Sequence, residues 1–427
     1  MKRKFLRALA LACFSLVATG AFVTAGPAYA SGDKAPQVSR AAGKALTEAR
    51  KLIDAKDYAG AVAALQQAVS AGDLKDYDKY IINTYLGIAY FQSGDQAKAG
   101  DAFVAASEVP NMRDSDHQEA VEKALMLLSA TNDYGKVIAF VEKDVPANAA
   151  LSENLLTMIG ICYYNTKHDQ QALDYAKRAI AAATAKNAIP QRDTYQLLLS
   201  AQNHMKDMAG EIATIQTMAG LYGTAEDWSR AIDVAVGSLP AANKNSRTVA
   251  AFFLYRRRME VGAATSADDY ELAAELATDQ NSPGDVIKVA NQAKAHGKTT
   301  KKLNAILAKA LGDARKDKAS LAAADAAAAK SANGTLDVSV AEGYYGYGMF
   351  ADAERVAARA VAKGGAKKNE ALMILGASQT LLGKNAEAAA TFAKVKGDAA
   401  LEKAAGCWTV YATRKYGKTA AAAPAAN

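Results

Sequence analysis

The stretch from Thr84 to Pro110 reads TYLGIAYFQSGDQAKAGDAFVAASEVP, and it decides the fold. Apolar residues recur every three or four positions on both sides of Gly94-Asp95, which predicts two amphipathic helices joined by a short turn. Gly87 and Ala99 are small, so the two helix backbones can approach each other closely. Pro110 ends the second helix because it has no backbone N–H to continue the ladder. The stretch therefore predicts an antiparallel helical hairpin.

One such hairpin cannot bury its own apolar face, so it needs neighbours of the same kind. Tyr90 and Phe103 supply the bulk that would fill the space between the hairpin and its neighbour. The chain supplies such neighbours, since the position of Ala99 recurs in a series at intervals of 38, 38, 35 and 40 residues. The series consists of Ala61, Ala99, Val137, Ala172 and Ile212, and further copies follow at Ala353 and Ala388. The sequence predicts an array of stacked hairpins.

This pattern resembles the tetratricopeptide repeat (TPR), whose period is about 34 residues. The resemblance rests on Leu86-Gly87-x-x-Tyr90, Gly94-Asp95 and Ala99-x-x-x-Phe103, and it extends over roughly residues 40–416. The chain is similar to bacterial periplasmic TPR proteins, although Asn83 stands where this repeat usually has Trp. The resemblance implies an all-α fold, a right-handed α-solenoid of helix pairs with a C-terminal capping helix at 401–416. It also implies a concave groove that binds segments of other proteins.

The first 30 residues have the three parts of a secretory signal peptide. Basic residues come first, an apolar run follows, and Ala28-Tyr29-Ala30 ends the segment. We expect cleavage after Ala30 and a periplasmic protein with no membrane span afterwards. An uncleaved anchor or a lipoprotein at Cys13 is less favoured, because the apolar run is short for a span and contains Gly20. Residues 31–39 form a leader and 417–427 an Ala-rich tail, and both are predicted to be disordered.

The repeat signal weakens in the middle of the chain, which suggests three parts after the leader. We expect an N-terminal TPR array at 40–240 and degenerate repeats or a helical spacer at 241–335. C-terminal TPR units with the capping helix are expected at 336–416. The Ala- and Lys-rich segment 298–330 fits either a degenerate repeat or a spacer.

Charge and cysteine content narrow the class of partner. The formal net charge of +7 is partly due to the signal peptide, and the remaining excess lies in the C-terminal half. Basic residues do not cluster densely with aromatic ones, so nucleic acid is not expected as a partner. Ordinary solvated helix faces explain the charge, and an acidic partner on the C-terminal half is the alternative. Cys162 and Cys407 are expected to be two separate buried thiols.

No catalytic, cofactor or metal motif stands out, so we expect a non-enzymatic protein without a cofactor. The sequence has no His-Glu-x-x-His helix, phosphate-binding loop or Gly-x-Ser-x-Gly elbow. We attribute the Ser31-x-x-Lys34 spacing to coincidence. We attribute the glycine-rich run 343–348 to the turn of a repeat. His168 and His296 fall near turns and predict surface or capping roles. Arg256-Arg257-Arg258 would fan over about 200° of a helix, which favours a solvated face.

Binding must then come from polar or aromatic positions that the repeat pattern leaves free. The candidate groove contacts are Asn83, Asn165, Gln196, Asn203, Tyr345 and Gln379. Tyr345 can instead fill the core, and Asn203 and Gln379 can be internal because they occupy the position of Tyr90. The sequence thus predicts an exported scaffold that binds peptide segments or protein surfaces, as an adaptor in cell-envelope assembly or transport. A cell-wall polysaccharide-binding module and an accessory subunit of an envelope enzyme are the alternatives.

Overall fold

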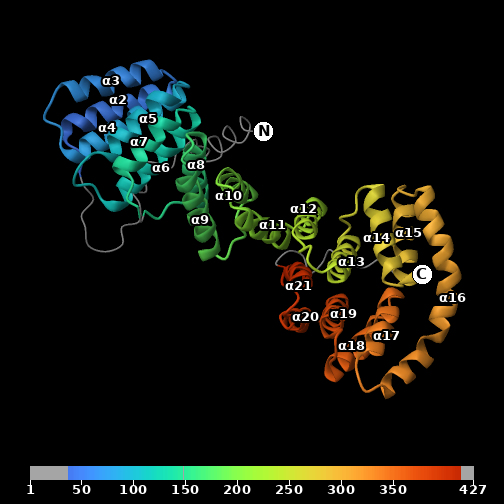
Figure 1. Ribbon diagram of the computed structural model, residues 1–427. Coiled ribbons are helices and arrows are strands. Elements are labelled where there is room, and N and C mark those ends of the chain that lie inside the picture. The colour runs from blue at the N-terminus through green and yellow to red at the C-terminus, as the bar shows by residue number, and fades with distance from the viewer. Residues whose placement is uncertain (1–36, 148, 415–427) are drawn as a thin grey trace. The chain divides into compact units, whose positions relative to one another are not determined.

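The computed structural model describes residues 37–147 and 149–414. The predicted signal peptide and its cleavage site, Ser31-x-x-Lys34, most of the leader and the tail 417–427 lie outside the described residues. The described part contains 20 helices, α2 to α21, and no strand (Figure 1). The predicted all-α fold is therefore confirmed. The chain falls into two compact units, residues 1–207 and 208–427, so the division lies inside the segment 40–240 that the sequence suggested as one array.

Unit 1 is a series of four described helical hairpins, each formed by two consecutive helices, followed by one further helix. Its described helices are α2 (Arg40–Asp54), α3 (Tyr58–Ser70), α4 (Asp76–Gln92), α5 (Gln96–Ser107), α6 (Asp114–Ala130), α7 (Tyr134–Asp144), α8 (Glu153–Asn165), α9 (Asp169–Ala185) and α10 (Arg192–His204).

The turns before α3, α5 and α7 share the same local conformation. A residue with left-handed backbone follows the first helix, as with Lys56 at φ 60°, Gly94 at φ 88° and Asn132 at φ 60°. The next residue is an aspartate that caps the second helix, because its side chain accepts the backbone N–H three positions on. Asp95, for example, accepts from the N–H of Lys98 at 3.1 Å. The repeated turn explains why the hairpins recur at nearly constant intervals.

Small residues hold the hairpins of unit 1 together, as the sequence predicted. Ala99, Val137 and Ala172 occupy the equivalent repeat position and are fully buried. Gly87 lies against the ring of Phe103, and a Cβ atom built at Gly87 would be 2.5 Å from Phe103 Cε2. No side chain fits there without displacing the ring, so the glycine sets how closely α4 and α5 approach.

Several first helices of successive hairpins also touch each other. Among the described elements, α2 packs on α4, α6 on α8, and α8 on α10, while the second helices α3, α5, α7 and α9 make no comparably extensive contacts with one another. Polar bonds join the same row, including Thr157 Oγ1 to Thr194 Oγ1 at 2.9 Å. A stack that is tighter along its first helices curves toward them, so these helices line the inner face of unit 1.

Unit 2 contains the remaining described helices. They are α11 (Met208–Tyr222), α12 (Ala225–Gly237), α13 (Lys244–Glu260), α14 (Ala267–Asp279), α15 (Pro283–Ala295), α16 (Lys301–Lys330), α17 (Thr335–Gly346), α18 (Phe350–Lys363), α19 (Lys368–Leu381), α20 (Asn385–Phe392) and α21 (Ala399–Ala412).

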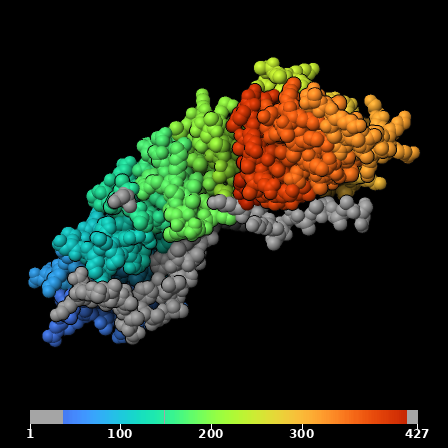
Figure 2. Space-filling model, turned by 90° about the horizontal axis from the view of Figure 1, so that it is seen from below, coloured from blue at the N-terminus to red at the C-terminus, as the bar shows by residue number. Residues whose placement is uncertain are grey.

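The predicted terminal helix is present as α21, but it does not cap an exposed end of a stack. It packs on α20 and α19 and also returns to α11, α12 and α13 at the beginning of the same unit (Figure 1). Ser246 donates its hydroxyl to Asp398, and Trp408 Nε1 donates to the carbonyl of Phe253 at 2.9 Å. The orange and red helices of unit 2 meet without a visible gap on the face shown in Figure 2. Unit 2 is therefore closed by contacts between its first and last helices.

The segment 298–330 is mostly a single helix rather than a helix pair. α16 is 30 residues long, starts at the Thr300 cap and ends before Ser331. Only one stripe of it is buried, formed by Leu303, Ala310, Ala314, Leu321 and Ala328. In the structure this helix packs on α14, α15 and α17, and the choice between a degenerate repeat and a spacer stays a prediction.

Candidate functional site

Three consecutive arginines occupy the centre of unit 2, contrary to the expectation of a solvated face. The exposed fractions of Arg256, Arg257 and Arg258 on α13 are 5%, 0% and 3%. That expectation was wrong because α13 contacts α12, α14 and α21 and is therefore covered on several sides at once. The fan of about 200° directs each guanidinium toward a different neighbouring helix.

Arg256 joins α13 to α15 and α17. Its Nη2 donates to Asp285 on α15 and to Glu342 on α17, and Ser282 Oγ donates to Asp285 at 2.6 Å. The guanidinium also lies 4.1 Å from the ring centroids of Phe252 and Tyr345. Burial raises the pKa of Glu342 to about 7, although Arg256 opposes that rise. The ion pairs thus connect three helices through one side chain.

Arg258 makes the equivalent connection to α12 and α14. Its Nη1 donates to Asp233 at 2.7 Å and its Nη2 to Ser229 Oγ at 2.6 Å, both on α12. Its Nε lies 3.2 Å from a carboxylate oxygen of Asp269 on α14 and also donates to the carbonyl of Ala263. Bonds between charged groups of this kind are about twice as strong as neutral ones, so α13 is fixed on this side as well.

Arg257 points toward α21 and meets aromatic faces instead of carboxylates. Its guanidinium carbon lies 4.7 Å from the ring centroid of Trp408 and 3.5 Å from that of Tyr411. Trp228 on α12 packs edge-on against the same Tyr411 ring, with centroids 5.7 Å apart. These contacts make α13 the hub against which α21 closes unit 2.

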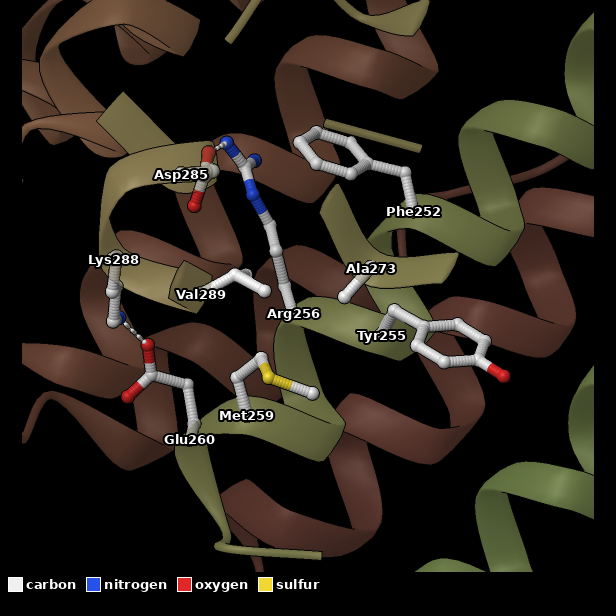
Figure 3. Close-up of a pocket in the computed structure, with 9 residues that line it drawn as sticks. All are labelled: Phe252, Tyr255, Arg256, Met259, Glu260, Ala273, Asp285, Lys288 and Val289. Carbon is white, nitrogen blue, oxygen red and sulfur yellow. Dashed lines mark hydrogen bonds and ion pairs between the residues drawn. The ribbon is translucent and has the colours of Figure 1, made fainter. Parts of the chain in front are cut away.

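A small cavity lies beside this hub, and it is too small for a peptide or a cofactor. Its volume is about 10 Å³, which is room for about one water molecule. Figure 3 shows the Arg256 guanidinium beside Asp285, and Lys288 paired with Glu260 on the other side of Val289. The space beside Arg256 is therefore filled by side chains and offers no room for a protein partner.

Two of the six candidate groove contacts belong to this packed interior. Tyr345 on α17 is 2% exposed and lies under Arg256. Gln379 on α19 is 8% exposed and accepts a hydrogen bond from Thr391 at 2.8 Å. The prediction that they contact a ligand is therefore corrected, and the alternative that they are internal to the packing holds. Packed side chains, not an open groove, surround both residues.

The other four candidates lie in unit 1, where the structure places them on first helices. Asn83 on α4 and Asn165 on α8 are half-buried, while Gln196 and Asn203 on α10 are exposed. Asn165 donates its amide to the Ile161 carbonyl of its own helix at 2.7 Å. Their role as groove contacts remains a prediction.

The structure adds an apolar surface on the same row of helices, which sequence reasoning missed. Ile88, Met126 and Ile161 are half-buried and sit 38 and 35 residues apart on α4, α6 and α8, at equivalent repeat positions. We call these three residues the apolar ladder. On α4 the stripe continues, since Tyr77, Ile81 and Phe91 fall on the same helical face and are also half-buried. The repeat pattern does not require apolar residues at these positions. Their presence there was the sequence signal that could have revealed the surface.

The ladder ends near a polar cluster between α8 and α10. Tyr164 and His204 stack with ring centroids 4.7 Å apart, and His204 Nδ1 lies 3.1 Å from Asp169 Oδ1. His168 and His296 cap α9 and α15 at exposed positions, as their places near turns predicted.

Two further properties of the described residues bear on function. No group of three or more His, Cys, Asp or Glu side chains within residues 37–147 and 149–414 could hold a metal ion. None of the helices α2 to α21 combines the length and the apolar character needed to cross a bilayer. Cys162 and Cys407 are free and buried, as predicted.

The geometry thus defines a helical-repeat protein built from TPR-like hairpins. Beyond that class, no protein-family model matches the chain, and neither does any curated protein. Among solved structures, the chain is similar to a tetratricopeptide repeat protein from Parabacteroides merdae, at 10% identity and a TM-score of 0.33, covering 64% of this chain and 100% of that one.

Two other solved structures are similar in the same limited way. The structure of Naa15/Naa10 bound to HypK-THB matches at 16% identity and a TM-score of 0.34, over 83% of this chain and 53% of that one. The TPR2AB-domain:pHSP90 complex of yeast Sti1 matches at 12% identity and a TM-score of 0.20, over 87% of this chain and 98% of that one. Likenesses at these scores carry no argument about function.

Proposed function

We propose that the protein is a scaffold that binds an extended or helical segment of another protein on the inner face of unit 1. The observation that carries the proposal is the apolar ladder of Ile88, Met126 and Ile161, which is only partly buried on three successive first helices. Apolar surface that a fold leaves uncovered in a row commonly marks a protein-interaction site. The packed interior of unit 2 supports the same choice, since its one described cavity beside Arg256 holds about one water.

The geometry of the ladder also suggests the pattern of the partner. Neighbouring packed helices lie about 8–10 Å apart, so successive ladder residues should have a similar spacing. An extended segment advances about 3.3 Å per residue, and a helix about 1.5 Å. The bound segment would therefore carry apolar side chains at about every third residue if extended, or at about every sixth if helical.

We further propose that the protein is exported and acts as an adaptor in cell-envelope assembly or transport. The N-terminal sequence pattern supports this part, and it lies outside the described residues. N-terminal sequencing of the protein from a periplasmic fraction should give Ser31 as the first residue. Recovery of the intact N-terminus from the cytosol would contradict the proposal.

Site-specific photo-crosslinking tests the binding surface. A photoreactive residue at Met126 should give a covalent adduct with a protein from envelope extracts, and the same residue at Leu311, which is exposed on α16 of unit 2, is the matched control. Ile88→Glu in a chain labelled at Met126 should abolish the adduct with little change in Tm. Adducts of equal yield from Met126 and Leu311 would refute the ladder as the binding surface.

A cell-wall polysaccharide is the second candidate ligand, because Tyr77 and Phe91 add aromatic area beside the ladder. A sacculus-binding assay separates the two. Retention on bare peptidoglycan, lost in Phe91→Ala, would favour the polysaccharide. If the protein binds a partner protein and is not retained on bare peptidoglycan, the scaffold is favoured.

A further inference from the structure

The outer side of α16 carries a row of cations that have no ion-pair partner among the described residues. The helix contains seven basic and three acidic side chains. Lys302 pairs with Glu271 and Glu275, and the Nζ of Lys318 lies 5.7 Å from the centroid of the Tyr347 ring. The other five cations are exposed, and we call them the basic row: Lys301, Lys309, Arg315, Lys316 and Lys330.

The carboxylates of α16 mostly turn the other way. Asp317 accepts a hydrogen bond from the Tyr347 hydroxyl at 2.8 Å, and Asp325 pairs with Arg355 on α18 at 2.7 Å. Asp313 is the one exposed carboxylate of this helix. Positive and negative charges are therefore separated across α16, and the positive charges face outward.

Helix geometry puts the basic row on one face. At about 100° per residue, all five cations lie within about 65° of the direction opposite the buried stripe of α16, and Asp313 lies about 100° from that direction. Every other residue of this face between Lys301 and Lys330 is alanine or glycine. The helix is about 45 Å long. Figure 1 shows it at the outer edge of unit 2, and its packed neighbours α14, α15 and α17 lie on its inner side.

The composition of this face indicates the kind of partner. Protein interfaces depend on aromatic or other bulky side chains that fill a pocket, and single-stranded nucleic acid stacks on aromatic rings. The face of the basic row has neither, so its recognition rests on charge alone. The small residues between the cations let a flat surface approach the helix along its length. An anionic bilayer offers such a surface, and each Lys or Arg held near it strengthens binding about fivefold.

We propose that the basic row docks unit 2 on the surface of a bilayer that contains anionic phospholipid. The five side chains contact headgroup phosphates, and the alanines and the glycine keep the helix close to the headgroups. No side chain of this face is apolar and large enough to insert into the hydrocarbon, so the docking is peripheral and reversible. The apolar ladder of unit 1 takes no part in it, so this proposal stands independently of the proposed function.

Co-sedimentation with vesicles tests the docking. The protein that starts at Ser31 is used, because the basic residues of the predicted signal peptide could bind anionic lipid themselves. It should sediment at low salt with vesicles of phosphatidylcholine and phosphatidylglycerol, and it should stay in solution with phosphatidylcholine alone. About 1 M salt, where the Debye length falls to about 3 Å, should release it. Equal binding to the two kinds of vesicle would overturn the proposal.

Two triple variants of equal net charge locate the effect. The first removes three exposed cations from the middle of the basic row: Lys309→Gln, Arg315→Gln and Lys316→Gln. It should bind the phosphatidylglycerol vesicles on the order of 100-fold more weakly. The control removes three exposed cations of unit 1 and should bind like the unaltered protein: Lys51→Gln, Lys177→Gln and Lys186→Gln.

Both variants should keep the Tm of the unaltered protein, since all six side chains are exposed. Equal affinities of the two triple variants for the vesicles would overturn the proposal. Binding to immobilised poly-L-glutamate without binding to the phosphatidylglycerol vesicles would overturn it as well, because the basic row would then serve an acidic protein segment.

Discussion

Gly87 gives the sharpest test of the packing described above. A Cβ atom at Gly87 would lie 2.5, 2.8 and 2.9 Å from Cε2, Cδ2 and Cζ of the Phe103 ring. Contacts this short force the ring or the α4 backbone to move, and overpacking of this kind costs about 1–3 kcal/mol. Alanine also gains about 1 kcal/mol over glycine in a helix interior, so the two effects oppose each other.

Gly312 separates the two effects, because it lies inside α16 and a Cβ atom built there meets nothing within 4 Å. Gly312→Ala should therefore show the helix gain alone and stabilise by about 1 kcal/mol. Gly87→Ala carries the overpacking cost in addition to the helix gain. Its effect on the free energy of unfolding should therefore be about 1–3 kcal/mol less stabilising than the effect of Gly312→Ala.

Urea denaturation followed by circular dichroism measures both changes, provided that the transitions of the two units are fitted separately. Phe103→Leu combined with Gly87→Ala should recover part of the loss, since a smaller side chain leaves room for the new methyl group. If Gly87→Ala stabilises unit 1 as much as Gly312→Ala stabilises unit 2, the close-approach explanation fails.

Three further predictions concern the hub of unit 2. Arg256→Met leaves Asp285 and Glu342 without their cation and should destabilise unit 2 by about 3–5 kcal/mol in urea titrations, while an unchanged midpoint would contradict the ion-pair hub. Since burial raises the pKa of Glu342 from 4.5 to about 7, its contribution to stability is complete below pH 4.5 and is lost as the pH rises through 7. Glu342→Gln should flatten that part of the stability profile, and an identical profile would reject this assignment. Trp408→Phe removes the donor to the Phe253 carbonyl and should lower the stability of unit 2 by about 1–3 kcal/mol, measured by its Tm, whereas no loss would show that the bond does not contribute.

Local sequence signals predicted the hairpins well. Gly87 and Gly376 stand 16 residues before Phe103 and Phe392, and in both cases a Cβ atom at the glycine would clash with the ring. Pro283 stands at the first position of α15, where a proline is favoured because the backbone N–H there has no partner in the helix. These features depend on residues within one turn or one hairpin, so the sequence shows them directly.

The arginines were misread because their burial depends on distant parts of the chain. A run of three cations on one helix is normally solvated, and no local pattern shows that Asp285, Glu342 and Trp408 come to meet it. The closure of unit 2 has the same origin, since nothing near Phe253 indicates a partner 155 residues away. The partly buried stripe on α4 is different, because Ile81 and Ile88 already fell at helical spacing and could have been recognised.

The closure of unit 2 has a consequence for the order in which the chain can fold. Hairpins of unit 1 contact mainly the preceding and following helices, so each can pack soon after it is synthesised. Unit 2 differs, because Trp408 must reach a carbonyl 155 residues earlier before the core around α13 is covered. A nascent chain that has not yet reached Ala399 leaves Trp228 and Arg257 without the helix that buries them. Translation of the last helix is therefore the event that completes this half of the protein, and a stop codon before residue 399 should yield an aggregation-prone product.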